Sequence, residues 1–226
     1  MFKPNFAVAL LVLGISFGTK ASAAEIYDWS GAYIGAHAGY GWAKPEWDLS
    51  NFGPIEGPLE DMKDKSFLGG VHVGYSFQQM NWVLGIEASI SAGKFKSAAD
   101  ACEFMCAVGT KVAWTGDIAG RVGYAVDRSL IYVRGGAALA DVKSFYTFGG
   151  LNPFNQTLSS DKRIRVGWTL GAGFEYALSR HVSASLDYRY ANFGTDDSDL
   201  HGRFTIDHFD RSLSMQTVMV GLNYRF

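Results

Sequence analysis

The 226-residue sequence has little cysteine and proline, and it has no tract of basic or acidic residues. It contains 2 Cys and 5 Pro, against 27 Gly, 16 Phe, 11 Tyr and 6 Trp. A formal net charge of −2 without a basic patch gives a nucleic-acid partner no support, so none is expected. Scarce proline with abundant glycine and aromatic residues favours many twisted strands over a helical bundle.

Long apolar runs are also missing, apart from one short run at the start of the chain. Lys3 supplies a positive charge, residues 6–17 are an apolar core, and residues 21–23 (Ala-Ser-Ala) offer a small-residue cleavage site. This is the anatomy of a secretory signal peptide, and the run is too short for a transmembrane helix. We therefore expect residues 1–23 to be a signal peptide and residues 24–226 to form one exported domain.

The remaining sequence alternates with period two, which is the mark of a strand with two different faces. In one block, Val71, Val73 and Tyr75 share one parity, and His72 and Gly74 share the other. Each block has about the length that a tilted membrane strand needs. Eight such blocks lie within residues 31–40, 66–77, 82–91, 114–124, 131–139, 165–176, 182–190 and 218–226.

The connections between the blocks alternate in length. Short ones are expected near 78–81, 126–129 and 178–181. Long, polar ones are expected near 43–65, 94–109, 143–162 and 195–210. Short turns at one end and long loops at the other are typical of an outer-membrane barrel.

Aromatic residues form two groups along the predicted strands. A membrane–water interface selects two such belts on one face, whereas a soluble β-sandwich does not. We therefore expect an all-β protein, an eight-stranded antiparallel up-and-down transmembrane β-barrel. The belt near the short turns would hold Trp29, Phe77, Trp82, Tyr124, Tyr176, Tyr224 and Phe226, and the belt near the long loops Trp42, Trp114, Trp168 and Tyr190.

Several glycine-aromatic segments resemble those of small porin-like, opacity-type outer-membrane surface antigens of Gram-negative bacteria. The segments are 29–42, 69–75, 120–125, 167–176 and 220–226. In the last of them, Gly221, Tyr224 and Phe226 look like the C-terminal signal read by the barrel-assembly machinery, although Met219 stands where that signal often has a polar residue.

This resemblance implies an integral protein of the cell outer membrane that contributes to envelope integrity and surface interaction. Fold analogy does not select one function within such a family. A narrow porin for small solutes remains an alternative. So does a surface adhesin or haem-binding protein that acts through its long loops.

Charged residues on the polar faces predict a belt inside the barrel. Counted up from the short turns, His72, Glu87, Arg121, Arg134 and Asp187 fall at similar depth and point inward by parity. Eight strands leave an interior just wide enough for side chains, so we expect opposite charges to pair there rather than form a transport constriction. Serine, histidine and aspartate are scattered and no Gly-x-Ser-x-Gly pattern occurs, so no catalytic residues and no enzyme are expected.

Two further groups of residues lie in or near the expected loops. His201 and His208 stand among aspartates, a pattern typical of a solvated acidic loop, with a divalent cation or haem as alternatives. No cofactor or metal is expected. Outer-membrane lipid and lipopolysaccharide are the expected partners of a cationic group near the outer strand ends, because phosphate pairs with such charges. That group is Lys65, Lys94, Lys96, Lys111, Lys143, Lys162 and Arg163.

Cys102 and Cys106 predict a local disulfide, because both lie in one expected loop of an exported chain. The bridge would close a very short loop, so its entropic stabilisation should be small. Thiol titration of freshly purified, non-reduced protein should find no free thiol, and the C102S/C106S variant should still fold into the barrel. Two free thiols in the non-reduced protein would contradict the bridge.

Overall fold

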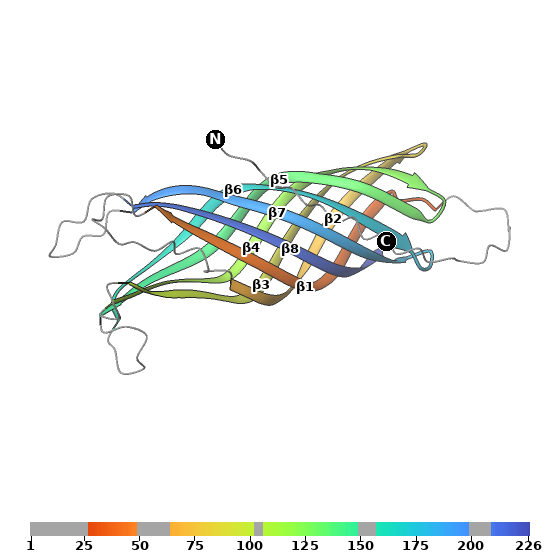
Figure 1. The fold of residues 1–226 in the computed structure, drawn as a ribbon. Coiled ribbons are helices and arrows are strands. Elements are labelled where there is room, and N and C mark those ends of the chain that lie inside the picture. The colour runs from red at the N-terminus through yellow and green to blue at the C-terminus, as the bar shows by residue number, and fades with distance from the viewer. Residues whose placement is uncertain (1–26, 49–63, 102–105, 149–156, 199–208) are drawn as a thin grey trace, which may run out of the picture.

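The computed structural model describes residues 27–48, 64–101, 106–148, 157–198 and 209–226, which form a closed antiparallel β-barrel (Figure 1). The expectation of an eight-stranded up-and-down barrel is confirmed. The described residues contain no helix long and apolar enough to cross a membrane. The strands are β1 (Gly31–Asp48), β2 (Asp64–Gln79), β3 (Trp82–Ala101), β4 (Cys106–Val126), β5 (Ser129–Phe148), β6 (Thr157–Ala177), β7 (Val182–Ser198) and β8 (Phe209–Arg225).

The barrel closes where β1 pairs with β8. Ala36 registers with Leu222 and Ala38 with Val220. At the end of β8 the backbone N–H of Phe226 donates to the Ala32 carbonyl at 3.0 Å. Closure pairs every strand on both sides, so no open sheet edge is exposed to lipid.

Side chains alternate between lipid and lumen along each strand. On β3, Ile86 and Ile90 are exposed on the outer face, whereas Glu87 and Ser89 are buried inside. Large apolar side chains with half their surface exposed are normal here, because lipid tails cover the outer face of such a barrel.

The strands are longer than the alternation predicted, with lengths from 16 to 21 residues. About 9–11 residues suffice to cross the membrane, so the hairpins continue beyond it. The prediction that residues 94–109 form a loop is wrong for most of that stretch, because β3 runs to Ala101 and pairs there with Cys106 at the start of β4. Residues 96–101 are small, polar or charged at both parities in the sequence, so they lack the period-two contrast on which the prediction depended.

The register of β4 shifts between Val112 and Thr115 against β5. As a result Val112 is buried and Ile118 is exposed, although both have even numbers. A β-bulge of this kind exchanges the two faces of a strand, which a simple parity count does not anticipate.

Trp29 does not belong to the lipid-facing belt that the sequence predicted. Its side chain is 0% exposed and lies inside the barrel, against Tyr27 at a ring-centroid distance of 4.6 Å. The residue precedes β1, so strand alternation does not govern where it points. The other turn-end aromatics of that belt, including Trp82, Tyr124 and Tyr176, are on the outer face.

Four predictions concern residues outside the described ranges, or residues of the strands whose side chains are not described. These are the signal peptide, the Cys102–Cys106 bridge, the loop histidines His201 and His208, and the side chains of Lys96 and Lys162. They stay predictions.

The C-terminal residue should be required for assembly. Phe226 is 75% exposed and packs on Tyr224 with ring centroids 5.3 Å apart, at the strand that closes the barrel. Deleting Phe226 should lower the amount of protein in outer-membrane fractions, whereas the control Phe67→Ala, an exposed aromatic at the other end of the barrel, should not. Wild-type levels of the truncated protein would contradict this.

Candidate functional site

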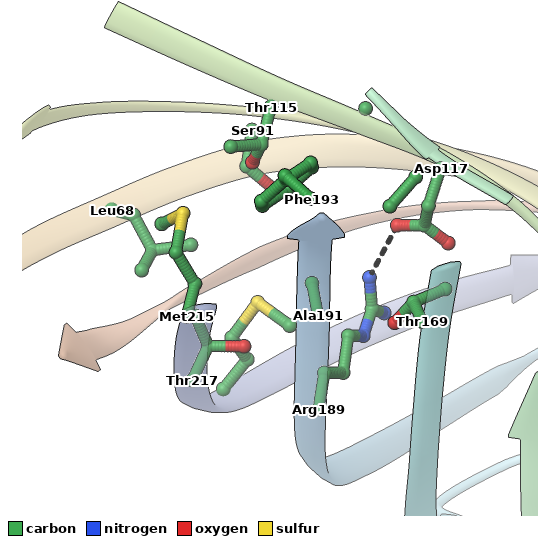
Figure 2. Close-up of a pocket in the computed structure, with 13 residues that line it drawn as sticks. Leu68, Ser91, Thr115, Asp117, Thr169, Arg189, Ala191, Phe193, Met215 and Thr217 are labelled. Carbon is green, nitrogen blue, oxygen red and sulfur yellow. Dashed lines mark hydrogen bonds and ion pairs between the residues drawn. The ribbon is translucent and has the colours of Figure 1, made fainter. Parts of the chain in front are cut away.

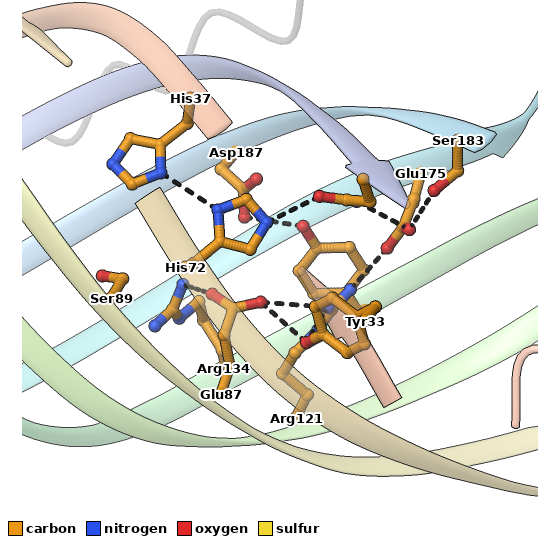
Figure 3. Close-up of polar contacts among 12 residues, drawn as sticks. Tyr33, His37, His72, Glu87, Ser89, Arg121, Arg134, Glu175, Ser183 and Asp187 are labelled. Atoms are coloured by element: carbon orange, nitrogen blue, oxygen red, sulfur yellow. Dashed lines mark hydrogen bonds and ion pairs between the residues drawn. The ribbon is translucent and has the colours of Figure 1, made fainter. Parts of the chain in front are cut away.

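The lumen holds a buried cluster whose charged side chains come from β3 to β8, and Tyr33 on β1 and His72 on β2 join it through hydrogen bonds (Figure 3). Glu87 on β3 is at its centre. Its Oε1 accepts hydrogen bonds from Arg134 at 2.7 Å and Arg189 at 3.4 Å, and its Oε2 accepts from Arg121 at 3.1 Å and from the Tyr33 hydroxyl at 2.9 Å. One carboxylate thus receives bonds from four donors carried by β1, β4, β5 and β7.

Glu175 on β6 forms a second centre. It is completely buried and accepts bonds from Arg121 at 2.8 Å, the Ser183 hydroxyl at 2.6 Å and the Asn223 amide at 2.8 Å. Arg225 lies 3.8 Å from its Oε1. Arg121 therefore bridges Glu87 and Glu175 with the two arms of its guanidinium.

Asp117 on β4 is the third anionic centre. It accepts hydrogen bonds from Arg134 and the Ser89 hydroxyl, and from Arg189 at 3.3 Å. Together with Asp187, the cluster contains four carboxylates and four arginines, so its formal charges cancel. The carboxylates are Glu87, Asp117, Glu175 and Asp187, and the arginines are Arg121, Arg134, Arg189 and Arg225.

Two tyrosines enclose the guanidinium of Arg121. Its Cζ lies 3.9 Å from the Tyr132 ring centroid and 5.5 Å from that of Tyr33. The Tyr132 hydroxyl donates to Asp187 at 2.6 Å, much as Tyr33 donates to Glu87. Cation–π contact and hydrogen bonding thus add to the ion pairs around Arg121.

Glycine on the adjacent strand makes room for each of these tyrosine rings. Gly74 is directly opposite Tyr33, and Gly173 is directly opposite Tyr132. A Cβ at Gly74 would lie 2.3 Å from the Tyr33 hydroxyl oxygen, and one at Gly173 would lie 2.4 Å from the Tyr132 ring. These two glycines are needed for the close approach of the rings.

Two histidines lie beside the ion pairs on the long-loop side. The Nδ1 atoms of His37 and His72 are 3.1 Å apart, and their rings stack with centroids 5.3 Å apart. The other ring nitrogens contact the Ser91 hydroxyl at 2.7 Å and the Asn223 amide oxygen at 2.6 Å. Both imidazoles are thereby fixed by polar partners.

An apolar plug lies at the short-turn end of the lumen. Trp29 is at its centre, where its backbone N–H donates to the Gln78 side chain at 2.7 Å and its carbonyl accepts a bond from Arg225. These contacts join the plug to the ionic cluster. The plug consists of Tyr27, Trp29, Val83, Ala125, Leu130, Tyr132 and Ala177.

A second apolar layer lies at the long-loop end, and a cavity of about 40 Å³ separates it from the ionic cluster (Figure 2). Asp117 and Arg189 line the cavity on one side, and Phe193 and Met215 on the other. Such a volume has room for a few water molecules at most. The layer consists of Ala43, Leu68, Phe95, Val112, Ala138, Ala140, Val142, Phe193, Leu213, Met215 and Met219.

Of the five residues in the predicted belt, all are buried within the barrel, but only three make direct ion pairs with one another. Glu87, Arg121 and Arg134 are joined through the Glu87 carboxylate. Asp187 instead accepts from Tyr132, and His72 contacts His37 and Asn223. Gly221, Tyr224 and Phe226 of the predicted assembly signal lie at the end of β8, and Gly221 is opposite His37 on β1.

Sequence reasoning left several members out of the belt. Glu175 and Arg189 also have the inward parity of their strands, so a belt drawn over a wider range of depths would have included them. Tyr33 and Tyr132 resemble ordinary aromatic strand residues, and nothing in the sequence marks them as hydrogen-bond donors to carboxylates. Met219, the departure from the usual C-terminal signal, is buried in the long-loop apolar layer.

The fold and its interior define a class: a small integral barrel with a lipid-facing apolar band and a filled lumen. Residues 7–226 match the family model described as "Outer membrane protein beta-barrel domain". The chain therefore belongs to the outer-membrane β-barrel family, and it is an outer-membrane protein with a role in the envelope and at the cell surface.

Curated relatives are also named as outer-membrane proteins. The chain is similar to a 31 kDa outer-membrane immunogenic protein of Brucella melitensis, with 32% identity covering 100% of this chain and 95% of the relative. A 25 kDa outer-membrane immunogenic protein of Brucella abortus is 30% identical over 88% of this chain and 80% of its own length. A 22 kDa outer membrane protein of Rhizobium leguminosarum is 27% identical over 88% of this chain and 78% of its own length.

Solved structures agree on the fold. Neisserial surface protein A superposes with a TM-score of 0.50 at 16% identity, covering 87% of this chain and 98% of that protein. The outer membrane protease OmpT of Escherichia coli reaches a TM-score of 0.51 at 10% identity, covering 86% and 97%. At such low identity these likenesses show a shared barrel architecture and nothing about activity.

Removing Arg121 should strongly destabilise the barrel. Arg121→Ala takes one cation from Glu87 and the nearest cation from Glu175, and breaking a buried pair typically costs about 3–5 kcal/mol. The free energy of unfolding, measured by urea titration in lipid vesicles, should fall by that order.

Two matched variants separate lost pairing from lost volume. Arg128→Ala, at an exposed short turn, should change the free energy of unfolding by no more than about 0.5 kcal/mol. The double variant R121M/E175Q removes both charges and should recover part of the loss. Equal stability of Arg121→Ala and wild type would show that the ion pairs do not hold the interior together.

Proposed function

We propose that this outer-membrane protein is a sealed structural barrel that does not conduct solutes and acts through its outer surface and its loop-bearing end. The single observation that supports this is the filled lumen. Three layers lie in series along the barrel axis: the turn-end plug, the ionic cluster and the long-loop apolar layer.

Each layer opposes the passage of ions by a different mechanism. The two apolar layers give a permeating ion nothing to replace its hydration shell. In the ionic cluster the carboxylates and guanidiniums already bind one another, so an entering ion must displace a buried partner. Barrels with aqueous channels have about 16–18 strands, roughly twice the number found here.

We further propose that the protein is not an enzyme. The contact between Ser91 and His37 is the observation that argues most directly for an enzyme. Their 2.7 Å separation would suit a nucleophile and its base. Both side chains, however, are only 6% exposed, and they lie beneath the long-loop apolar layer, which offers a lipid or peptide no route to them. His37 is oriented by a second histidine rather than by a carboxylate.

Planar-bilayer recordings test the sealed barrel. Refolded wild-type protein, checked for folding by its shifted mobility in unboiled detergent gels, should give no steady conductance. A water-filled porin inserted in the same bilayers serves as the positive control.

A stable, ion-selective channel in the wild type would overturn this proposal. The pore interpretation would then be tested with Arg134→Ala and Asp117→Asn, which remove opposite charges from one ion pair. Changes of selectivity in opposite directions would assign the permeation path to the ionic cluster.

A further inference from the structure

His37 and His72 are the middle links of a hydrogen-bonded chain that runs through the lumen (Figure 3). We refer to them as the histidine pair. The four contacts of the chain measure between 2.6 and 3.1 Å, and each joins a different pair of strands. In order, the five residues of the chain are Ser91 on β3, His37 on β1, His72 on β2, Asn223 on β8 and Glu175 on β6.

The backbone leaves room for both imidazole rings. His37 is directly opposite Gly70, and His72 is directly opposite Gly35. A Cβ at Gly70 would lie 2.8 Å from Nε2 of His37, and one at Gly35 would overlap the ring of His72. Each of the two strands thus has a glycine where the other carries a histidine, so the packing of both strands is adapted to the pair.

The direction of each hydrogen bond follows from Glu175 at the end of the chain. An ionised carboxylate only accepts hydrogen bonds, so the amide nitrogen of Asn223 faces Glu175, at 2.8 Å. The amide oxygen of Asn223 therefore faces His72, and Nε2 of His72 must carry a proton to donate to it.

The remaining protons are then fixed one by one. A neutral imidazole has one N–H and one bare nitrogen, so Nδ1 of His72 is bare and accepts from the Nδ1–H of His37. This leaves Nε2 of His37 bare, and the Ser91 hydroxyl donates to it. The two neutral rings thus have opposite tautomers, and every contact of the chain has one donor and one acceptor.

Two protons can be added to this pair, and they have different consequences. The first can bind Nε2 of His37, because the Ser91 hydroxyl can rotate to accept; Ser91 also lines the 40 Å³ cavity, which has room for water. The contact between the two Nδ1 atoms then remains. The second proton can bind only Nδ1 of His72, and two N–H groups would face each other across 3.1 Å. That proton breaks the contact and leaves two cations side by side.

The carboxylates near the pair already have partners. Glu87 binds Arg134 at 2.7 Å and Asp187 accepts from Tyr132 at 2.6 Å, whereas Arg189 adds a positive charge near His37. A second imidazolium would therefore be costly in so narrow a lumen. The titratable groups that face the pair or lie directly behind its neighbours are Tyr33 on β1, Glu87 on β3, Asp117 and Arg121 on β4, Arg134 on β5, Glu175 on β6, Asp187 and Arg189 on β7, and Arg225 on β8.

We propose that the histidine pair is a proton-binding site that stabilises the interior of the barrel while both rings are neutral and destabilises it when acid adds the second proton. The pKa of histidine in an unfolded chain is about 6.5. Below that pH the unfolded chain binds more protons than the folded pair does, so the stabilisation is complete above about pH 6.5 and is lost as the pH falls. The inference does not depend on whether the lumen conducts.

Nitrogen-15 NMR of the histidines in wild-type protein in lipid nanodiscs tests the arrangement. At pH 7.5 we expect a proton on Nδ1 of His37 and on Nε2 of His72, with a nitrogen–nitrogen coupling across the hydrogen bond that joins the two rings. On acidification, Nε2 of His37 should be protonated first and Nδ1 of His72 in a separate step at lower pH. The same tautomer in both rings at pH 7.5, or a single titration step shared by both, overturns the proposal.

Urea unfolding of the full-length protein in lipid vesicles measures the consequence for stability. Between pH 6.5 and 4.5 the unfolding equilibrium constant should rise about a hundredfold more in wild type than in H37Q/H72Q, since one proton excluded from the folded state contributes about tenfold per pH unit. Glutamine carries no charge and can still hydrogen-bond to Ser91 and Asn223. H181Q, which removes an exposed histidine at a short turn, is the control and should keep the pH dependence of wild type.

Equal pH dependence in wild type and H37Q/H72Q contradicts the proposal, and so does an equal loss of pH dependence in H181Q. The NMR measurement uses wild-type protein alone, so it decides the matter if H37Q/H72Q does not fold. Planar-bilayer recordings at pH 7.5 test the sealed barrel independently, because a channel at that pH would leave the order of protonation of the two rings unchanged.

Discussion

The interior depends on the neutralisation of Glu87. A carboxylate in so narrow a lumen is stable only if donors surround it, because an unpaired buried charge is costly. Arg121, Arg134, Arg189 and Tyr33 supply those donors from four different strands. Each arginine in turn needs a second acceptor, which extends the network to Glu175 and Asp117. Hydrogen bonds of Tyr33, Asn223 and His72 then join β1, β8 and β2 to it.

The sequence was sufficient to predict the fold and most inward positions, because one physical contrast runs through the whole chain. Lipid selects apolar residues at every second position, and the lumen admits polar ones, so parity alone separates Ile86 from Glu87 or Val133 from Arg134. The number of strands and the order of short turns followed from the same contrast. The strand ends did not, because polar and small residues occur at both parities near the long loops, so the alternation of the sequence fades there.

Partners within the lumen could not be derived from the sequence, because they depend on relations between strands. Parity predicts that Asp187 and His72 point inward, but not that Tyr132 reaches Asp187 while His72 turns to His37. Trp29 was misplaced because it precedes the first strand. The bulge between Val112 and Thr115 reverses which parity points inward along β4. The two apolar layers inside the lumen could not be predicted, because in the sequence their residues look the same as lipid-facing residues.

Inner and outer surfaces are fixed by the same register. A slip of one residue between two strands would exchange the faces of one of them and move its buried charges into lipid. The bonds of Arg121 to Glu87 and Glu175 tie β4 to β3 and β6, and Arg134 ties β5 to β3 and β4. The interior network therefore also fixes which side chains of these four strands face lipid.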